Sequence, residues 1–273
     1  GQVIDAVLGS ADDGIVQGEI GFDGIGEGKG NGAGGTALGD GAVEADGGRF
    51  DLEGAGSEAL CFEEDAGVES TIADVGTEPL LKSWVLLDNH DVKRVATELP
   101  DMAQRRLAQV LQFTLPGSPN LYYGSEVGMT GGDDPAQRGP MRWDLVSDTN
   151  PEMGWTKRLV AMRQQHRALR VGDYRSASAG QLLAFERHTD RAADSVLVLA
   201  NPEDKTVTEQ VQWRNGLMMD GNTLIDLLPP PEGSARAVVS SGFVRITMPP
   251  RSVRVLAPDV GTQGGYSVYK RVR

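Results

Sequence analysis

A short apolar run at residues 84–88 ends in Asn89-His90-Asp91, and this arrangement limits the fold more than any other feature of the chain. A nearly continuous apolar run of this length is typical of a parallel strand that is buried on both faces. In α/β barrels, the polar side chains that carry the chemistry follow the C-terminal ends of such strands. These three residues are therefore candidate functional residues at the end of a barrel strand.

Together with the apolar run at residues 84–88, the segment that follows predicts a strand, a helix and a second strand. Asp101 is the predicted N-cap of the helix, and apolar residues recur at helical spacing until Pro116-Gly117 ends it. Residues 120–124 then predict the second strand, and this order is the unit of a parallel sheet. Further on, one helix is predicted with a buried stripe of residues, namely Trp155, Leu159, Met162, His166 and Leu169. On that stripe a structural role is the better interpretation of His166.

After Gly180 the pattern changes to short strands separated by Gly, Pro, Asn and Asp. The predicted strands cover residues 182–187, 196–201, 207–213, 224–228, 238–239, 243–248 and 252–256. Several short strands at regular spacing favour an antiparallel β-sandwich. His188 follows the first of these strands beside Asp190 and Arg191, and we interpret it as part of a solvated turn. The fold class is therefore α/β followed by all-β.

The first 80 residues differ from the rest of the chain. They hold 20 of the 36 glycines and 18 acidic residues against two basic ones, Lys29 and Arg49. A stretch such as residues 24–40 has too little apolar surface to offset its ordering entropy, which predicts disorder or loose packing. A calcium-binding β-roll is an alternative, but its nonapeptide period is absent. The abrupt change near Thr77 favours a third interpretation, a shifted reading frame or faulty gene boundary.

Composition excludes several classes of function. The remaining residues hold 21 acidic and 24 basic side chains without a basic stripe, so we expect no nucleic acid partner. No apolar run approaches the roughly 20 residues that span a bilayer, and no signal peptide is visible, which favours a cytoplasmic location. Cys61 is the only cysteine, which excludes an intrachain disulfide framework and a cysteine-based zinc cluster. The oligomeric state is left open.

Four ordered motifs carry a family resemblance. They are LLDNHDVKR at residues 86–94, LPGSPNLYYGSEVGM at 115–129, GGDDPAQRGPMRWD at 131–144 and the terminal GYSVYKRV. Together they resemble the C-terminal half of the α-amylase family of glycoside hydrolases, most closely its cyclomaltodextrinase, neopullulanase and α-glucosidase-like members. The resemblance implies the last two βα units of a (β/α)8 barrel at residues 80–178, a C-terminal β-sandwich at 179–258 and a tail at 259–273, after an atypical segment at 1–79.

The resemblance also implies roles for individual residues. Asp91 matches the carboxylate that assists the transition state of a retaining glycosidase, and His90 matches the histidine that donates to the same sugar. Asp134 and Arg138 match the pair that holds the next sugar of an α-glucan or maltooligosaccharide, through an acceptor and a planar donor. Tyr122 and Tyr123 are expected to pack the barrel, and Glu126 to support the active-site loop. No metal ligand or cofactor is assigned; calcium is implied by the family alone.

The nucleophile and general acid of the family have no convincing counterpart in this sequence. Asp51, in GGRFD, fits the nucleophile pattern, but it lies only 40 residues before Asp91. A full barrel of about 250 residues would separate the fourth and seventh strands by roughly 90 residues. We therefore predict an α-glucan hydrolase fragment that is inactive alone. The alternatives are a noncatalytic carbohydrate-binding or interaction module with the same fold, or an active hydrolase whose missing carboxylates lie in the atypical segment.

Overall fold

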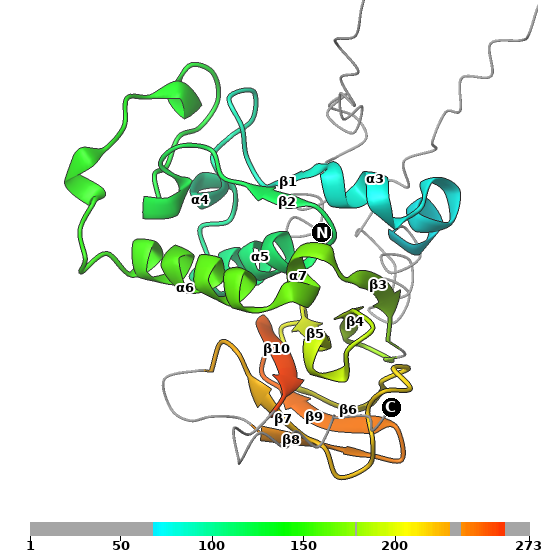
Figure 1. The fold of residues 1–273 in the computed structure, drawn as a ribbon. Coiled ribbons are helices and arrows are strands. Elements are labelled where there is room, and N and C mark those ends of the chain that lie inside the picture. The colour runs from blue at the N-terminus through cyan, green and yellow to red at the C-terminus, as the bar shows by residue number, and fades with distance from the viewer. Residues whose placement is uncertain (1–67, 178, 230–235, 260–273) are drawn as a thin grey trace, which may run out of the picture.

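The structure is a computed structural model that describes residues 68–177, 179–229 and 236–259. The expected disorder of the Gly-rich segment and the terminal GYSVYKRV motif lie outside these residues, as does Asp51. The described chain begins with helices and a small parallel sheet and continues into a large antiparallel sheet (Figure 1). This order confirms the predicted fold class, α/β followed by all-β.

Strands β1 (Trp84–Leu86) and β2 (Ser118–Asn120) are parallel and pair in register from Trp84 opposite Ser118. Helix α5 (Met102–Thr114) connects them, as the strand-helix-strand pattern predicts. Gly117 has φ +123°, and a Cβ atom there would lie 2.7 Å from Cγ2 of Val85. Only glycine therefore allows β2 to begin so close to β1.

The second strand was predicted two residues too late, at residues 120–124. Its place is decided by pairing with β1, a contact between distant segments that local apolar character does not reveal. The expected burial of the first strand on both faces is met only in part: Val85 and Leu87 are buried and Leu86 is half-buried, but Trp84 is 72% exposed. Within the described residues this sheet has only two strands, so one side of β1 is uncovered.

The helices pack behind this small sheet. The carboxylate of Asp101 caps α5 by accepting from the N–H groups of Ala103 and Gln104, as predicted. The predicted second helix is divided into α6 (Pro151–Gln165) and α7 (Arg167–Val171), because His166 has φ −104° and ψ 104°. Residues 68–75 are also helical, and the other helical elements are short: α3 (Thr77–Lys82), α4 (Val95–Glu98), η2 (Ser125–Val127), η3 (Ala136–Arg138), η4 (Trp143–Leu145) and η5 (Ala192–Asp194).

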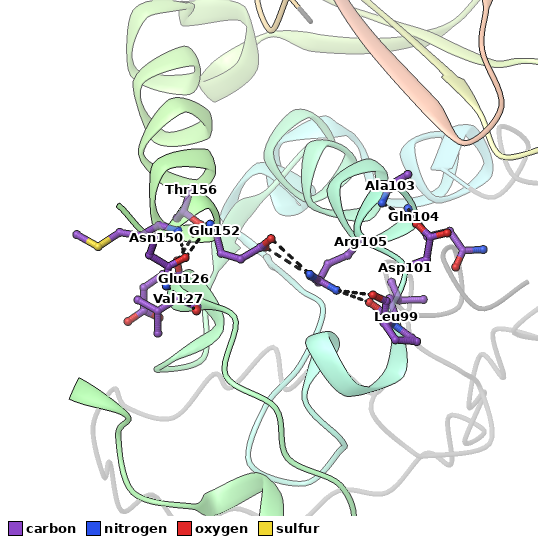
Figure 2. Close-up of polar contacts among 12 residues, drawn as sticks. Leu99, Asp101, Ala103, Gln104, Arg105, Glu126, Val127, Asn150, Glu152 and Thr156 are labelled. Atoms are coloured by element: carbon purple, nitrogen blue, oxygen red, sulfur yellow. Dashed lines mark hydrogen bonds and ion pairs between the residues drawn. The ribbon is translucent and has the colours of Figure 1, made fainter. Parts of the chain in front are cut away.

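A buried ion pair joins the two longest helices. The guanidinium of Arg105 in α5 lies 3.4 Å from the carboxylate of Glu152 in α6, and both side chains are only 9% exposed. Figure 2 shows this pair between the helices, together with the hydrogen bond from Arg105 Nη1 to the carbonyl oxygen of Leu99. Asn150 caps α6 and also donates to the carbonyl oxygens of Val127 and Leu145. These contacts fix α6 against the loops that follow β2.

The antiparallel sheet has eight strands. Their order across the sheet is β3 (Asp173–Ser176), β4 (Leu183–His188), β5 (Val196–Asn201), β10 (Ser252–Pro258), β7 (Thr223–Asp226), β8 (Arg236–Ser240), β9 (Phe243–Met248) and β6 (Val207–Gln212). Every neighbouring pair is antiparallel, and the sheet curls so that its two halves enclose a core. Strand β3 was missed because its sequence, DYRS, contains no apolar run.

Strands β4, β5 and β10 lie between two hydrophobic cores. Alternate side chains point to opposite faces of a strand, so Phe185 packs with the helices while Ala184 packs inside the curled sheet. Leu197 and Val198 divide in the same way between these cores. Burial on both faces explains why these strands read as apolar runs, whereas β6, β8 and β9 alternate between buried and exposed residues.

The prediction that His188 lies in a solvated turn is wrong. His188 is the last residue of β4, and its side chain is only 16% exposed. Its Nδ1 atom lies 3.6 Å from Oε1 of the buried Glu186. Burial lowers the pKa of His188, and Arg175 lowers it further, against the opposite effect of Asp173. Burial also raises the pKa of Glu186, although the indole N–H of Trp213 donates to its carboxylate. The pairing of β4 with β3 thus places His188 in a largely buried cluster of polar side chains.

Candidate functional site

The candidate site lies in the two loops that follow β1 and β2. In the first loop, the side-chain oxygen of Asn89 accepts from the main-chain N–H groups of Asp91, at 2.7 Å, and Val92, at 3.2 Å. This local turn fixes the backbone immediately after the strand. Nε2 of His90 lies 3.1 Å from Oδ2 of Asp91. The two adjacent residues therefore present an imidazole and a carboxylate together.

The second loop is joined to the first through the main-chain carbonyl of His90. This oxygen accepts from Nε of Arg138, at 3.0 Å, and from Nε2 of Gln137, at 3.1 Å. Arg138 also reaches Asp134 with an N to O distance of 3.2 Å. The structure thus connects the four residues that the sequence predicts, His90, Asp91, Asp134 and Arg138, through one chain of contacts.

These four side chains are open to solvent. They are 66%, 57%, 65% and 48% exposed for His90, Asp91, Asp134 and Arg138, respectively. Exposed ion pairs contribute little to stability, typically below about 1 kcal/mol. Their donors and acceptors consequently remain accessible to a polar ligand, and the arrangement suits the hydroxyl groups of a sugar.

Buried polar residues hold the two loops in place. One carboxylate oxygen of Asp88 accepts from the N–H of Val95, at 2.9 Å, and from the hydroxyl of Ser125, at 2.7 Å. Burial raises the pKa of this carboxyl, while the N–H of Val95, the Ser125 hydroxyl and Arg94 oppose the increase. Asp88 therefore bridges the segments after β1 and β2 and is itself removed from solvent.

Arg94 is a further buried residue of this region, fully shielded from solvent. Its Nη1 atom donates to the carbonyl oxygen of Tyr123, at 2.5 Å. The guanidinium carbon lies 4.6 Å from the ring centres of both Tyr122 and Tyr123, which fits cation-π contacts. The packing role of the tyrosines stays a prediction, but these contacts agree with it, and the hydroxyl of Tyr123 donates to the carbonyl of Gly139.

Sequence reasoning did not assign Gln137, Arg94 or Asp88 to the site. Gln137 is 1% exposed, and its contact with the carbonyl of His90 spans 47 residues of sequence. The signal for Arg94 and Gln137 was their position inside the quoted motifs, beside the assigned residues. For Asp88 the signal was a carboxylate at the end of an apolar strand. The support that Glu126 is expected to give this loop stays a prediction, and in the structure Glu126 borders a groove with α6.

A metal centre would need several ligands gathered at one point. No three His, Cys, Asp or Glu side chains do so in the described part of the chain. These residues therefore supply no such ligand set for the calcium that the resemblance implies, and we derive no chemistry through a metal.

In the same ranges, no helix is long and apolar enough to cross a membrane.

Comparison with known proteins relates this site to an enzyme family. Residues 68–189 match the model of the α-amylase catalytic domain. This part of the chain is therefore similar to the catalytic domain of the α-amylase family. The matched region contains β1, β2, both site loops and the first strands of the large sheet.

Individual relatives give the same result. A cyclomaltodextrinase of Bacillus sp. is 37% identical over 120 residues, which is 42% of this chain and 21% of that protein. Neopullulanase 2 of Thermoactinomyces vulgaris is 35% identical over 137 residues, which is 49% of this chain and 23% of that protein. The chain therefore spans about a fifth of the length of these α-amylase-family relatives.

The likeness to a solved structure covers more of the chain than residues 68–189. The debranching enzyme of Nostoc punctiforme, in its native form, superposes with a TM-score of 0.61 and 29% identity. The superposition covers 72% of this chain and 40% of that enzyme. Residues 68–189 and at least part of the antiparallel sheet after them thus recur together in this solved structure.

Proposed function

We propose that this chain supplies the sugar-binding part of an active site that cleaves α-glucosidic bonds of maltooligosaccharides, cyclodextrins or related α-glucans. The observation that carries the proposal is the chain of contacts from Asp91 and His90 to Arg138 and Asp134, across the loops after β1 and β2. Relatives named cyclomaltodextrinase and neopullulanase support this class of substrate.

The chemistry of the proposed reaction explains the residue types. A retaining glycosidase passes through an oxocarbenium-like state, which fixed negative charge stabilises. We assign this role to Asp91, and we assign to His90 a hydrogen bond to the same sugar. Asp134 accepts from hydroxyl groups of the next sugar, and Arg138 donates to them through its planar guanidinium. These groups bind a sugar ring and stabilise its distortion, but they do not by themselves break the bond.

The chain alone is proposed to be inactive. Retaining hydrolysis needs a nucleophilic carboxylate and a separate carboxylic acid. Asp88 is unsuited to either role because Val95 and Ser125 occupy one of its oxygens in a buried position. The sequence match at Asp51 has too short a spacing from Asp91 for a barrel of this kind.

Two measurements test the proposed function. The full chain should release no glucose or maltose from β-cyclodextrin or maltotriose above the blank. Turnover that Asp51→Asn abolishes would instead place the nucleophile in the atypical segment. In a second experiment, residues 80–258 replace the corresponding part of the Bacillus sp. cyclomaltodextrinase, and the graft should hydrolyse β-cyclodextrin.

Substitutions in that graft test the role of Asp91. Asp91→Asn should lower kcat by at least about 100-fold, because a fixed charge at the transition state is lost. Asp133→Asn is the matched control: its carboxylate is 87% exposed, and its ion pair within the described residues is with Lys93 at 3.5 Å. An active graft that tolerates Asp91→Asn as well as Asp133→Asn would refute the assignment.

A noncatalytic carbohydrate-binding module is the second candidate. The observation that favours it is Trp143, 75% exposed in the same loop as Asp134 and Arg138. Arg142 and Asp144 on either side of it form a two-point ion pair at 2.8 and 2.6 Å, which keeps polar groups beside the indole. Such a module predicts that the full chain binds maltoheptaose in calorimetry without turnover, and that Trp143→Ala weakens this binding.

A further inference from the structure

The peptide unit between His90 and Asp91 is held at both of its ends. Its carbonyl oxygen accepts from Nε2 of Gln137, at 3.1 Å, and from Nε of Arg138, at 3.0 Å. Its N–H group donates to the side-chain oxygen of Asn89, at 2.7 Å. A carbonyl oxygen has two lone pairs and an amide nitrogen has one proton, so these contacts use the full hydrogen-bonding capacity of the peptide unit. The tilt of this unit sets where both side chains point.

The two donors to this carbonyl differ in their surroundings. Gln137 is 1% exposed, whereas the side chain of Arg138 is 48% exposed. Arg138 also pairs with the carboxylate of Asp134, at 3.2 Å. Water competes for an exposed donor, and a hydrogen bond is electrostatically stronger in a buried position. Gln137 is therefore the donor better suited to fix the carbonyl while the guanidinium of Arg138 exchanges partners.

The main chain of Gln137 is anchored as well. Gly131 lies so close that a Cβ atom on it would be 2.8 Å from Cα of Gln137. Gly131 is in turn bound to the segment after β1, because its N–H donates to Oγ1 of Thr97, at 2.8 Å, and its carbonyl accepts from the N–H of Arg94, at 2.9 Å. These contacts position Gln137 independently of the exposed side chains of the site.

The side chain of Gln137 holds the site through a single hydrogen bond. Nε2 donates to the carbonyl of His90, while Oε1 is buried without a hydrogen-bond partner in the described structure. A buried acceptor without a partner reduces stability, so an apolar side chain of similar size would suit a purely structural role. The donation to His90 is what a glutamine supplies here and an apolar side chain does not.

We propose that Gln137 is a positioning residue of the candidate site, which orients the Asp91 carboxylate through the His90–Asp91 peptide unit. This inference deepens the proposed function and rests on it. Gln137 is buried and acts on kcat, by holding Asp91 where charge develops in the transition state. Arg138 contacts the sugar and acts mainly on KM. Two neighbouring residues thus divide placement from binding.

The first test follows the contact in the full 273-residue chain by nuclear magnetic resonance. The carbonyl carbon resonance of His90 reports hydrogen bonds to its oxygen, and Gln137→Met, which removes the donor and keeps the volume, should move it upfield. Gln137→Glu should do the same at neutral pH, because an ionised carboxylate can only accept. Burial raises the pKa of a carboxyl, and below that pKa the neutral form donates again, so the resonance should return. A resonance that neither substitution moves would overturn the inference.

The second test measures catalysis in the grafted cyclomaltodextrinase, with folding verified by circular dichroism at each pH. Gln137→Met should lower kcat for β-cyclodextrin about tenfold and change KM by less than about twofold. The kcat of Gln137→Glu, divided by that of Gln137→Met, should rise as pH falls, which a loss of packing would not produce. Gln109→Met is the control, since Gln109 is a buried glutamine of α5, outside both site loops. An equal fall of kcat in Gln109→Met and Gln137→Met would overturn the inference.

Asn89 gives access to the other end of the same peptide unit if the Gln137 variants fail to fold. Asn89→Ala removes the acceptor for the N–H of Asp91, whereas Asn89→Ser keeps a weaker one. The kcat should fall in Asn89→Ala and recover in part in Asn89→Ser. Equal kcat values in the two grafts would contradict control of catalysis by the orientation of this peptide unit.

The two tests distinguish failure of this inference from failure of the proposed function. A graft that does not hydrolyse β-cyclodextrin contradicts the proposed function, and the His90 resonance in the full chain then decides whether Gln137 orients the peptide unit. An active graft whose kcat is insensitive to Gln137→Met supports the proposed function and overturns the inference.

Discussion

The main-chain carbonyl oxygen of His90 accepts a hydrogen bond from Nε of Arg138, at 3.0 Å, across 48 residues of sequence. Arg138 uses the same guanidinium to reach the carboxylate of Asp134. This side chain therefore joins the loop after β1 to the loop after β2, beside the contact of Gln137 with the same carbonyl. If both loops bind one oligosaccharide, the fit of neighbouring sugars depends on this guanidinium.

Replacement of Arg138 by lysine tests this dependence in the grafted cyclomaltodextrinase. Arg138→Lys should raise KM for β-cyclodextrin about tenfold, a loss of roughly 1.4 kcal/mol in binding, because a lysine lacks the planar fork that serves two acceptors. Steady-state kinetics measure the change. The control is Arg142→Lys, since Arg142 contacts Asp144 only two residues away. Similar KM values for both variants would show that Arg138 does not coordinate the loops.

The buried pair of Arg105 and Glu152 should couple α5 to α6. Arg105→Met leaves the Glu152 carboxylate buried without its partner and the carbonyl of Leu99 without its donor, so it should cost about 3–5 kcal/mol of unfolding free energy. The double variant with Glu152→Leu should recover a large part of this loss. Urea denaturation of the four proteins in this cycle measures the coupling, and additive losses would contradict it.

Asn150 should stabilise α6 through two separate sets of contacts. Asn150→Ala removes the cap on the N–H groups of Glu152 and Met153 and two donations to the preceding turns, at a cost of roughly 1–2 kcal/mol. Asn150→Asp keeps the cap acceptor but loses the donations, so its cost should be intermediate. Thermal denaturation compares the two variants, and equal losses would show that the cap contributes nothing.

His188 should make stability depend on pH. Its pKa is lowered by burial, so between the folded value and the unfolded value near 6.5 the unfolded chain binds more protons than the folded one. Its contribution to stability is therefore full above the unfolded pKa and is lost as pH falls toward the folded pKa. His188→Asn should reduce the rise in unfolding free energy between about pH 5 and 7.

The control for this pH dependence is His90→Asn, because the imidazole of His90 is 66% exposed. Urea denaturation at several pH values gives the slope for each variant relative to the unsubstituted chain. A slope that falls as much in His90→Asn as in His188→Asn would refute the role assigned to burial. The comparison also cancels the opposite contributions of Asp88 and Asp226, whose pKa values are raised by burial and which do not contact His188 in the described structure.

Local signals predicted the elements that local chemistry controls. Helix α5 was located correctly because Asp101 caps it and Pro116-Gly117 follow its end. Strand β2 was misplaced because only its pairing with β1 sets its position, and β3 was missed because β4 rather than apolar character orders it. The break at His166 likewise interrupts an apolar stripe that continues on both sides.

In the candidate site, too, local sequence identified some residues, whereas contacts between distant segments decided the others. His90, Asp91, Asp134 and Arg138 could be named because motifs carry their identity along the sequence. The supporting groups could not, since Gln137 reaches a main-chain carbonyl 47 residues away and Ser125 reaches Asp88 across 37 residues. Such contacts depend on how two strands lie beside each other, which a single sequence does not specify.

Ala184 and Phe185 are adjacent in β4, yet one packs inside the curled sheet and the other against the helices. If such a strand unfolds, it removes side chains from both cores at once. The two cores are therefore coupled through the shared strands β4, β5 and β10. The helical part and the antiparallel sheet should therefore denature as one cooperative unit, with a single calorimetric peak rather than two. Hydrogen exchange should correspondingly be slowest in these three shared strands.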